Sequence, residues 1–337
     1  MSAPVRAAVV GAGAWGTALG AVLAGKGHDV VVWSYEDDVV ASINSGEGNR
    51  YLPDVALPPS LRAEADLAAA VRGAEVVVSA APSQFVRGVM EGAAPHLATD
   101  ALLVSASKGI ELVSFLRMDE VLAEVLPDSI MRRFCALSGP SFASEVAQGA
   151  PTAVVVASRA EEAAVRARDL FLTPSFRVYT NSDVIGVELG GALKNVVALA
   201  AGVSAGLGYG HNTLAALITR GLAEMTRLGV AAGAEKATFY GLAGVGDLVL
   251  TCTGSLSRNR TVGYRLGRGE SLDEILSDMS AVAEGVKAAE AVDELARRHG
   301  VEMPIMEQMY AIVHEGRSPS DALRTLMSRE PKTEDWS

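Results

Sequence analysis

The sequence predicts a two-part fold, in which a doubly wound α/β domain precedes an all-α domain. Short β-branched runs alternate with Ala-rich segments of helical spacing up to about residue 180, and strand-like runs then disappear. Continuous apolar strands that alternate with helices indicate a parallel sheet covered on both faces. A glycine-rich turn follows the first of these runs. We therefore expect an α/β domain over residues 1–182, a helical domain over 183–330 and a loose tail over 331–337.

The individual elements follow from runs of apolar residues and from their spacing. The expected strands are Ala7–Val10, Asp29–Trp33, Glu75–Ala80, Ala101–Ala106 and Thr152–Ala157. Helices between them are expected at Asp66–Val71 and Met118–Val125. In the second part, Ala, Leu, Gly and Glu recur with a helical period. The helices expected there are Ile185–Ser204, Thr213–Leu228, Leu272–Met279, Glu284–His299 and Pro304–Glu315.

The composition is that of a globular protein without a general affinity for nucleic acid. Apolar residues make up 49% and charged residues 20% of the 337 residues, which argues against a disordered chain. The net charge of −11 argues against nonspecific binding to nucleic acid. An acidic protein that binds an anion must gather its cations at one place.

Cysteine usage and hydropathy predict a soluble, cytoplasmic protein without a metal. Cys135 and Cys252 share no metal-type spacing, which is typical of a cytosolic chain with reduced thiols. The five His do not cluster with Cys or acidic residues, so no structural zinc is expected. The N-terminus lacks the apolar core and cleavage site of a signal peptide. The longest apolar run, Val196–Leu207, is too short and too rich in glycine to span a bilayer.

The turn after the first strand reads Gly11-Ala-Gly13-Ala-Trp15-Gly16, a G-x-G-x-x-G pattern that opens a helix. Gly11 permits the tight turn, Gly13 lets the backbone approach a pyrophosphate, and Gly16 allows close packing of helix against strand. The phosphates of a dinucleotide would lie on amide donors at the helix N-terminus. The pattern indicates a Rossmann-type domain. The alternative is a tight turn in a sheet that binds no nucleotide.

The end of the second strand bears on the choice between NAD and NADP. An acid at this point binds a ribose 2′-hydroxyl, whereas an Arg favours a 2′-phosphate. This strand end is followed by Glu36, Asp37 and Asp38 but by no Arg, which favours NAD. Arg50 lies not far downstream. The three acids also suit the solvated first turn of a helix, where they interact with its macrodipole.

Polar residues also follow two later strands. Lys108 comes just after a strand, at the edge where ligands of doubly wound sheets bind. Gly139, Pro140 and Ser141 precede a helix and offer free amides suited to an anion. The alternatives are a surface cation for Lys108 and an N-cap for Ser141.

A third polar segment lies in the helical part. It joins Asp247 to a loop that contains Ser257, Arg258, Asn259 and Arg260. Such a set of polar residues is unusual for a segment that serves only as scaffold. The alternatives are a cap or turn for Asp247 and solvated loop charges for the two Arg.

Lys194 stands in the middle of a small and apolar stretch, Val187–Gly208. Small residues lie three, four or seven positions away on the same helix face: Gly190, Gly191, Ala198 and Ala201. This stripe lets another backbone or a ligand come close to the ammonium. Burial lowers the pKa of a Lys from its usual value of about 10.4 and makes it a better base at neutral pH. The alternative is helix–helix packing, with the Lys snorkelling to the edge.

Together these motifs make the sequence similar to a known enzyme family. They occur in the order GAGAWGTALG, SASKG, SGPSFASE, GVELGGALKNVVALAAG, ITRGLAEMTRLG, FYGLAGVGDLVLTCTGSLSRNR and VAEG. The chain resembles bacterial-type NAD(P)-dependent sn-glycerol-3-phosphate dehydrogenase over nearly its whole length. The resemblance implies reduction of dihydroxyacetone phosphate by NAD(P)H, without a metal. It also implies an architecture like that of 6-phosphogluconate dehydrogenase, a cytoplasmic homodimer, and a role in glycerophospholipid synthesis.

The resemblance further implies roles for individual residues. Lys194 would accept the proton of the oxidised alcohol and donate it in the reverse direction, and Lys108 would contact both substrate and cofactor. The substrate positions are Lys108, Gly139, Ser141, Lys194, Asp247, Ser257, Arg258 and Asn259. The cofactor positions, with the fingerprint glycines, are Gly11, Gly13, Ala14, Trp15, Gly16, Tyr35, Lys108, Ala143, Arg258, Val282 and Glu284. Asp247 would orient either Lys194 or a substrate hydroxyl.

Two departures from the family pattern concern the cofactor. Relatives often carry Ser where Ala14 stands, so one side-chain contact to a phosphate is lost. They also often carry a basic residue or His near Tyr35, and its absence leaves the usual NADPH preference open. Two alternative functions are another β-hydroxyacid or sugar-acid dehydrogenase of the same architecture, and a non-catalytic NAD(H)-sensing protein. The joint presence of the polar residues above favours the enzyme.

Overall fold

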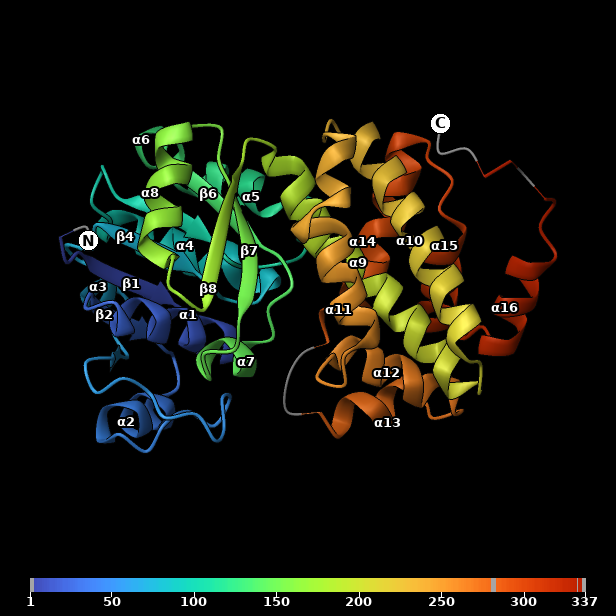
Figure 1. Cartoon of the computed structure of the whole chain (residues 1–337), viewed down its shortest axis with the longest axis horizontal. Coiled ribbons are helices and arrows are strands. Elements are labelled where there is room, and N and C mark those ends of the chain that lie inside the picture. Colours follow the sequence, from blue (N-terminus) through green and yellow to red (C-terminus); the bar gives the residue numbers. More distant parts are fainter. Residues whose placement is uncertain (1–2, 280–282, 332, 335–337) are drawn as a thin grey trace. The chain divides into compact units, whose positions relative to one another are not determined.

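The computed structural model describes residues 3–279, 283–331 and 333–334 (Figure 1). The chain divides into two compact units. The first comprises Met1–Lys108 and Leu116–Val187, and the second comprises Gly109–Phe115 and Glu188–Ser337. The short segment after Lys108 thus belongs to the helical unit, although residues of the first unit flank it. The domain boundaries expected after residues 182 and 330 stay predictions.

The first unit is built on a mixed sheet with eight strands in its described residues (Figure 1). They are β1 (Arg6–Val10), β2 (Asp29–Trp33), β3 (Arg62–Glu64), β4 (Val76–Ser79), β5 (Leu102–Ser105), β6 (Phe134–Ser138), β7 (Thr152–Ala157) and β8 (Phe176–Asn181). Their order in the sheet is β3-β2-β1-β4-β5-β6-β7-β8. The order reverses between β1 and β4, and the carboxyl ends of strands at such a switch point form a ligand crevice.

The predicted parallel sheet is confirmed for every pair except β6 and β7, which run antiparallel. The connection between these two strands contains only the five-residue helix α7 (Ala143–Ala147). A parallel neighbour requires a longer crossover, usually a full helix. The eleven-residue α8 (Glu161–Phe171) supplies such a crossover between β7 and β8, which are parallel. The five expected strands are present, whereas β3, β6 and β8 were not expected.

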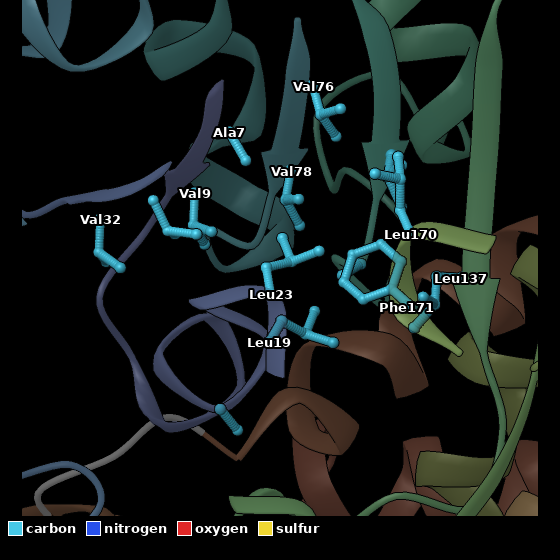
Figure 2. Packing of buried hydrophobic residues seen from close by; sticks show 14 of the residues in the cluster. Ala7, Val9, Leu19, Leu23, Val32, Val76, Val78, Leu137, Leu170 and Phe171 are labelled. Atoms are coloured by element: carbon cyan, nitrogen blue, oxygen red, sulfur yellow. The ribbon is translucent and has the colours of Figure 1, made fainter. Parts of the chain in front are cut away.

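One face of the sheet packs on α1 (Ala14–Gly25) and α8. Leu19 and Leu23 of α1 lie with Val78 of β4 and Phe171 of α8 in one fully buried cluster (Figure 2). This packing fixes α1 on the sheet. It thereby also fixes the N-terminus of α1, which directly follows the glycine turn. The other helices of this unit are α2 (Asp37–Ser45), α3 (Leu67–Val71), α4 (Val86–Ala93), α5 (Met118–Val125) and α6 (Asp128–Met131), with 3₁₀ turns η1 (Ser83–Phe85) and η2 (Ala94–His96).

The regular elements among the described residues of the second unit are helices, as expected. Its helices are α9 (Val184–Gly206), α10 (His211–Ala231), α11 (Asp247–Thr253), α12 (Arg258–Gly267), α13 (Leu272–Ser277), α14 (Glu284–His299), α15 (Pro304–His314) and α16 (Pro319–Met327). A 3₁₀ segment, η3 (Lys236–Tyr240), and a π-helical segment, η4 (Leu242–Gly246), connect α10 to α11. The helices at α11, α12 and α16 were not expected from the sequence.

Helix α9 packs closely on α12 through backbone contacts at glycines. A Cβ at Gly202 would lie 2.1 Å from the carbonyl oxygen of Arg260, and a Cβ at Gly263 would lie 2.0 Å from that of Leu199. Only glycine therefore allows α9 and α12 to approach so closely. With 23 residues, α9 is long and apolar enough to cross a membrane. The expectation that the apolar run in this region, Val196–Leu207, is too short to span a bilayer is therefore wrong. Because 89% of its apolar window is buried in the protein, α9 has the pattern of a core helix.

Candidate active site

The glycine turn of the first unit has the geometry that a dinucleotide pyrophosphate needs. Gly11 has a φ of +121°, which residues with a side chain rarely adopt. A Cβ at Gly11 would also lie 2.9 Å from the backbone of Ala80. A Cβ at Gly16 would lie 1.9 Å from the carbonyl oxygen of Gly11. By contrast, a Cβ at Gly13 would meet no atom within 4 Å, so the backbone is open to a ligand there. The turn therefore needs glycine at Gly11 and Gly16 and is open at Gly13, which fits a bound dinucleotide. The contacts of these three glycines with a cofactor stay predictions.

Two buried polar side chains hold this turn in place. Thr17 of α1 donates from Oγ1 to the carbonyl oxygen of Ala12 over 3.2 Å. Asn49, in the loop after α2, donates from Nδ2 to the same carbonyl over 2.8 Å and to Thr17 Oγ1 over 2.7 Å. The Ala12 carbonyl is thereby satisfied inside the protein, and the first N–H groups of α1 are left for a ligand. Neither Thr17 nor Asn49 was predicted from the sequence.

Arg50 lies at the end of β2, where the sequence alone showed acids and no Arg. Its two terminal nitrogens pair with Glu36 and Asp38. Its guanidinium lies over the ring of Tyr51, 5.0 Å from the ring centroid, and Tyr51 Oη donates to Glu36 Oε1 over 2.8 Å. The loop after α2 thus folds back and brings Arg50, which lies not far downstream in the sequence, to the acids that follow β2. Tyr35 is 78% exposed, and its contact with a cofactor stays a prediction.

Lys108 and the segment after β6 come together in the first unit. Lys108 donates from Nζ to the carbonyl oxygen of Gly139 over 3.1 Å, and Ser141 donates from Oγ to the same carbonyl over 2.9 Å. Gly139 has a φ of +128°, so the turn requires glycine. The N-cap of α7 is Phe142 and its first residue is Ala143, so the alternative that Ser141 is an N-cap is wrong. These residues lie where β5 and β6 end, at the predicted ligand edge of the sheet.

Lys194 lies in the second unit and is only 7% exposed. Its Nζ donates to Asp247 Oδ1 over 2.5 Å and to Thr251 Oγ1 over 2.9 Å. Thr251, one turn along α11, also donates from Oγ1 to the carbonyl oxygen of Asp247 over 2.6 Å. Of the two roles considered for Asp247, orientation of Lys194 therefore fits the geometry. Thr251 was not predicted, although its spacing of four from Asp247 on one helix face could have indicated it.

Three groups from different helices form an amide relay beside this lysine. Asn259 donates from Nδ2 to Asn195 Oδ1 over 2.9 Å, and its Oδ1 accepts from the backbone N–H of Gly285 over 2.9 Å. Because a backbone N–H can only donate, Gly285 fixes the orientation of both amides. Asn195 Nδ2 in turn donates to the carbonyl oxygen of Gly191 over 3.5 Å. A Cβ at Gly285 would lie 2.8 Å from the carbonyl oxygen of Asn195, so only glycine fits. Asn195 and Gly285 were not predicted as site residues.

The N-terminus of α12 offers a place for an anion. Ser257 is its N-cap and accepts from the backbone N–H of Arg260 over 3.2 Å. Arg258 is the first helical residue and is exposed. The start of a helix has a partial positive charge and unpaired N–H groups, which favour a bound anion. A guanidinium at this point strengthens the same preference.

The small residues around Lys194 make room for protein backbone. A Cβ at Gly190 would lie 2.5 Å from the carbonyl oxygen of Ala243, so η4 occupies this side of α9. Ala198 and Ala201 are buried. At Gly190 the stripe therefore admits another backbone, which is one of the two possibilities expected for it. Lys194 itself is buried against Asp247 and does not snorkel to the edge of the helix.

The remaining predicted cofactor residues lie at the starts of helices. Ala14 and Trp15 are the first two residues of α1, directly after the glycine turn. Glu284 is the first residue of α14 and is half-buried. Val282 lies outside the described residues. The cofactor contacts of these four residues stay predictions.

A sheet domain with a dinucleotide-binding turn, together with a helical domain that holds a buried lysine against a carboxylate, defines the class of nicotinamide-dependent dehydrogenases. Residues 6–164 match the family "NAD-dependent glycerol-3-phosphate dehydrogenase N-terminus", and residues 183–324 match its C-terminus. The chain belongs to the NAD-dependent glycerol-3-phosphate dehydrogenase family. The resemblance inferred from the ordered motifs is thereby confirmed.

Relatives cover nearly the whole chain. A glycerol-3-phosphate dehydrogenase (NAD(P)+) of Geobacter metallireducens is 57% identical over 327 residues, which cover 97% of this chain and 98% of the relative. One of Geobacter sulfurreducens is 55% identical over 332 residues, which cover 98% and 99%. The crystal structure of glycerol-3-phosphate dehydrogenase from Coxiella burnetii has a TM-score of 0.91 and 40% identity, and the match covers 97% of this chain and 99% of that chain. The likeness thus extends over both units and supports NAD(P)H as the cofactor.

Proposed function

We propose that this protein reversibly reduces dihydroxyacetone phosphate to sn-glycerol 3-phosphate with NAD(P)H. The observation that carries this proposal is the buried ammonium of Lys194, held by Asp247 and Thr251. The named activity of relatives that match over both units supports the same reaction. No observation favours a sugar-acid dehydrogenase or a non-catalytic sensor.

Reduction of the C2 ketone requires a hydride, which a bound nicotinamide supplies, and leaves an alkoxide that needs a proton. Lys194 donates this proton from Nζ and takes it back in the reverse direction. Asp247 and Thr251 fix where Nζ points, and Asp247 compensates the buried positive charge. Lys108 adds a second cation that stabilises the negative oxygen.

The phosphate of the substrate is held by a separate set of donors. Arg258 makes a forked, charge-assisted contact with it, supported by the N-terminus of α12. Asn259 also donates to the phosphate, through the side-chain N–H that does not bond Asn195. Its amide has this orientation because its carbonyl oxygen already accepts from the backbone N–H of Gly285. The remaining proposed substrate contacts are Gly139, Ser141 and Ser257.

We further propose a cytoplasmic homodimer that supplies glycerol phosphate for glycerophospholipid synthesis. The burial of α9 within the protein supports a soluble enzyme, without membrane insertion. The anion-binding N-terminus of α12 supports a small anionic substrate. The net charge of −11 argues against nucleic acid as a partner. Size-exclusion chromatography with light scattering tests the homodimer.

The function is tested by following the absorbance of NADH and of NADPH, each with and without dihydroxyacetone phosphate. We expect oxidation that requires the ketone, and Lys194→Met should reduce kcat by at least about 10²-fold, the usual range for a general acid–base group. Lys236→Met is the matched control, since Lys236 is an exposed lysine of the same unit. A folded Lys194→Met protein with near wild-type kcat would remove Lys194 from the mechanism. A folded wild-type protein that binds NADH without turnover would exclude the dehydrogenase.

A further inference from the structure

The loop after α2 is tied to the glycine turn and to the end of β2 at once. Asn49 anchors it, because its Nδ2 donates to the carbonyl oxygen of Ala12 within the turn. The turn itself is joined to β2, since the backbone N–H of Gly11 donates to the carbonyl oxygen of Trp33 over 3.2 Å. Arg50 follows Asn49 directly and therefore points from an anchored backbone to the place where the adenosine ribose of a dinucleotide lies in such folds.

At this place Arg50 is fully engaged by acids. One terminal nitrogen pairs with Glu36 and the other with Asp38, so its fork is not available for a bidentate contact to a phosphate. Tyr51 supports the arrangement, since its Oη donates to Glu36 and its ring lies under the guanidinium. Glu36 is only 17% exposed at its side chain, so the pair is held from within the fold.

The charges of the cluster disfavour a further negative group. Two carboxylates and one guanidinium leave one net negative charge, and Asp37 in the same helical turn adds another. A 2′-phosphate carries −1.5 to −2 charges at neutral pH, by analogy with other phosphomonoesters. A ribose 2′-hydroxyl is neutral and can donate to a carboxylate, which is the usual acidic recognition of NAD.

We propose that Glu36, Asp38 and Arg50 form the cofactor-selecting element of this enzyme, and that the element favours NADH over NADPH. The proposal rests on NAD(P)H as the cofactor. The two acids repel the 2′-phosphate and also hold the guanidinium of Arg50, which would otherwise be available to bind it. Neutralising both acids would remove the repulsion and release the guanidinium.

The test measures the affinities of the purified protein for NADH and for NADPH by nicotinamide fluorescence, with no ketone present. One unit charge about 4 Å away in water changes an affinity by about fivefold. We therefore expect wild-type protein to bind NADH about tenfold or more tightly than NADPH. Glu36→Gln combined with Asp38→Asn should bring this ratio to about one or below. High salt should lower the wild-type ratio, because the side chain of Asp38 is 65% exposed and its repulsion of a 2′-phosphate is therefore screened.

Arg50→Leu separates the two effects. In the wild-type background it should keep or raise the preference for NADH, since both acids then lose their counter-ion. Added to the two neutralised acids, it should weaken NADPH binding again by about tenfold. Asp29→Asn is the matched control, because Asp29 is an exposed acid at the other end of β2 that pairs with Arg62 in the same way. It should leave the ratio unchanged.

Equal or tighter binding of NADPH by the wild-type protein would overturn the proposal, as would an unchanged ratio after neutralisation of both acids. Melting temperatures identify a variant that fails to fold. If the variant with both acids neutralised does not fold, the Arg50→Leu variant and the salt dependence of the wild-type preference for NADH still test the proposal. A protein that prefers NADH but does not reduce dihydroxyacetone phosphate would contradict the proposed function and leave this inference intact. A protein that reduces dihydroxyacetone phosphate but binds NADH and NADPH equally would support the proposed function and contradict this inference.

Discussion

Among the described residues, Lys194 is the only Lys or Arg that is buried. A buried charge needs a close partner, and removal of one member of such a pair costs about 3–5 kcal/mol. Asp247 is that partner, at 1% exposure, while Thr251 has no charge and accepts a single hydrogen bond from the ammonium. Two side chains thus hold the same ammonium with different strengths, and this difference can be measured.

Asp247→Asn should therefore be far more damaging than Thr251→Val. We expect the free energy of unfolding at pH 7 to fall by about 3 kcal/mol or more for Asp247→Asn, and by about 1–2 kcal/mol for Thr251→Val. Urea unfolding checks both values, and kcat should fall in the same order because Lys194 loses its orientation. Equal losses of stability in the two variants would show that Asp247 does not act as the counter-ion.

Residues of the candidate site differ in how well the sequence predicted them. Lys194 stood out because an ammonium in an apolar stretch is unusual, and Asp247 because it begins a polar segment. Thr251 and Asn49 were missed, since a single Thr or Asn has no distinguishing pattern before its partners are known. Arg50 lies not far downstream of β2 in the sequence, but its contact with Glu36 depends on the return of the loop after α2, which has no local sequence pattern.

At the scale of elements, continuous β-branched runs predicted strands to within one residue at each end, as for β4 and β7. The missed strands lack that signal. β6 has the sequence FCALS, fully buried but without a β-branched residue, and β8 has FRVYTN, in which buried and exposed residues alternate at the start. Alternation with period two would have identified β8 as a half-exposed strand. β7 runs antiparallel to β6 because the connection between these two strands is short, and no local sequence pattern indicates this direction.

Helices α10 and α15 are joined by a buried carboxylate whose charge depends on pH. Glu224 accepts from the backbone N–H groups of Ile305 over 2.9 Å and of Met306 over 3.2 Å, in the first turn of α15. Burial raises the pKa of Glu224 to about 7, with Glu307 also raising it, while these hydrogen bonds and the charge of Arg227 lower it. The folded protein therefore binds this proton more tightly than the unfolded chain.

The sign of the pH dependence follows from this raised pKa. The contribution of Glu224 is fully present below the ordinary Glu pKa of about 4.5 and is lost as the pH rises through about 7. Relative to Glu224→Gln, which cannot ionise, the wild-type free energy of unfolding should fall by up to about 3 kcal/mol between these pH values. Urea unfolding of both proteins across that range checks the difference. A difference that does not change with pH would show that Glu224 keeps one protonation state.

At the scale of the whole molecule, each unit contains one buried thiol. Cys135 lies in β6 of the first unit and Cys252 in α11 of the second, and both are free and fully buried. Burial raises the pKa of each thiol to about 12, even though Lys194 and Arg260 lower that of Cys252. The thiolate is the reactive form, so neither cysteine should react with a thiol reagent until its own unit opens.

The two cysteines therefore report separately on the two units. The dinucleotide-binding turn belongs to the first unit, so NADH should stabilise that unit by mass action. At a concentration 100 times its Kd, NADH stabilises the state that binds it by about 2.7 kcal/mol, which corresponds to about 100-fold slower opening-limited labelling. We expect this full effect on Cys135 in a Cys252→Ala variant, and a smaller effect on Cys252 in a Cys135→Ala variant. Labelling rates with an aromatic disulfide reagent in mild urea, with and without NADH, give both values. Equal protection of the two thiols would mean that the units open together, so that ligand binding in one is felt throughout the chain.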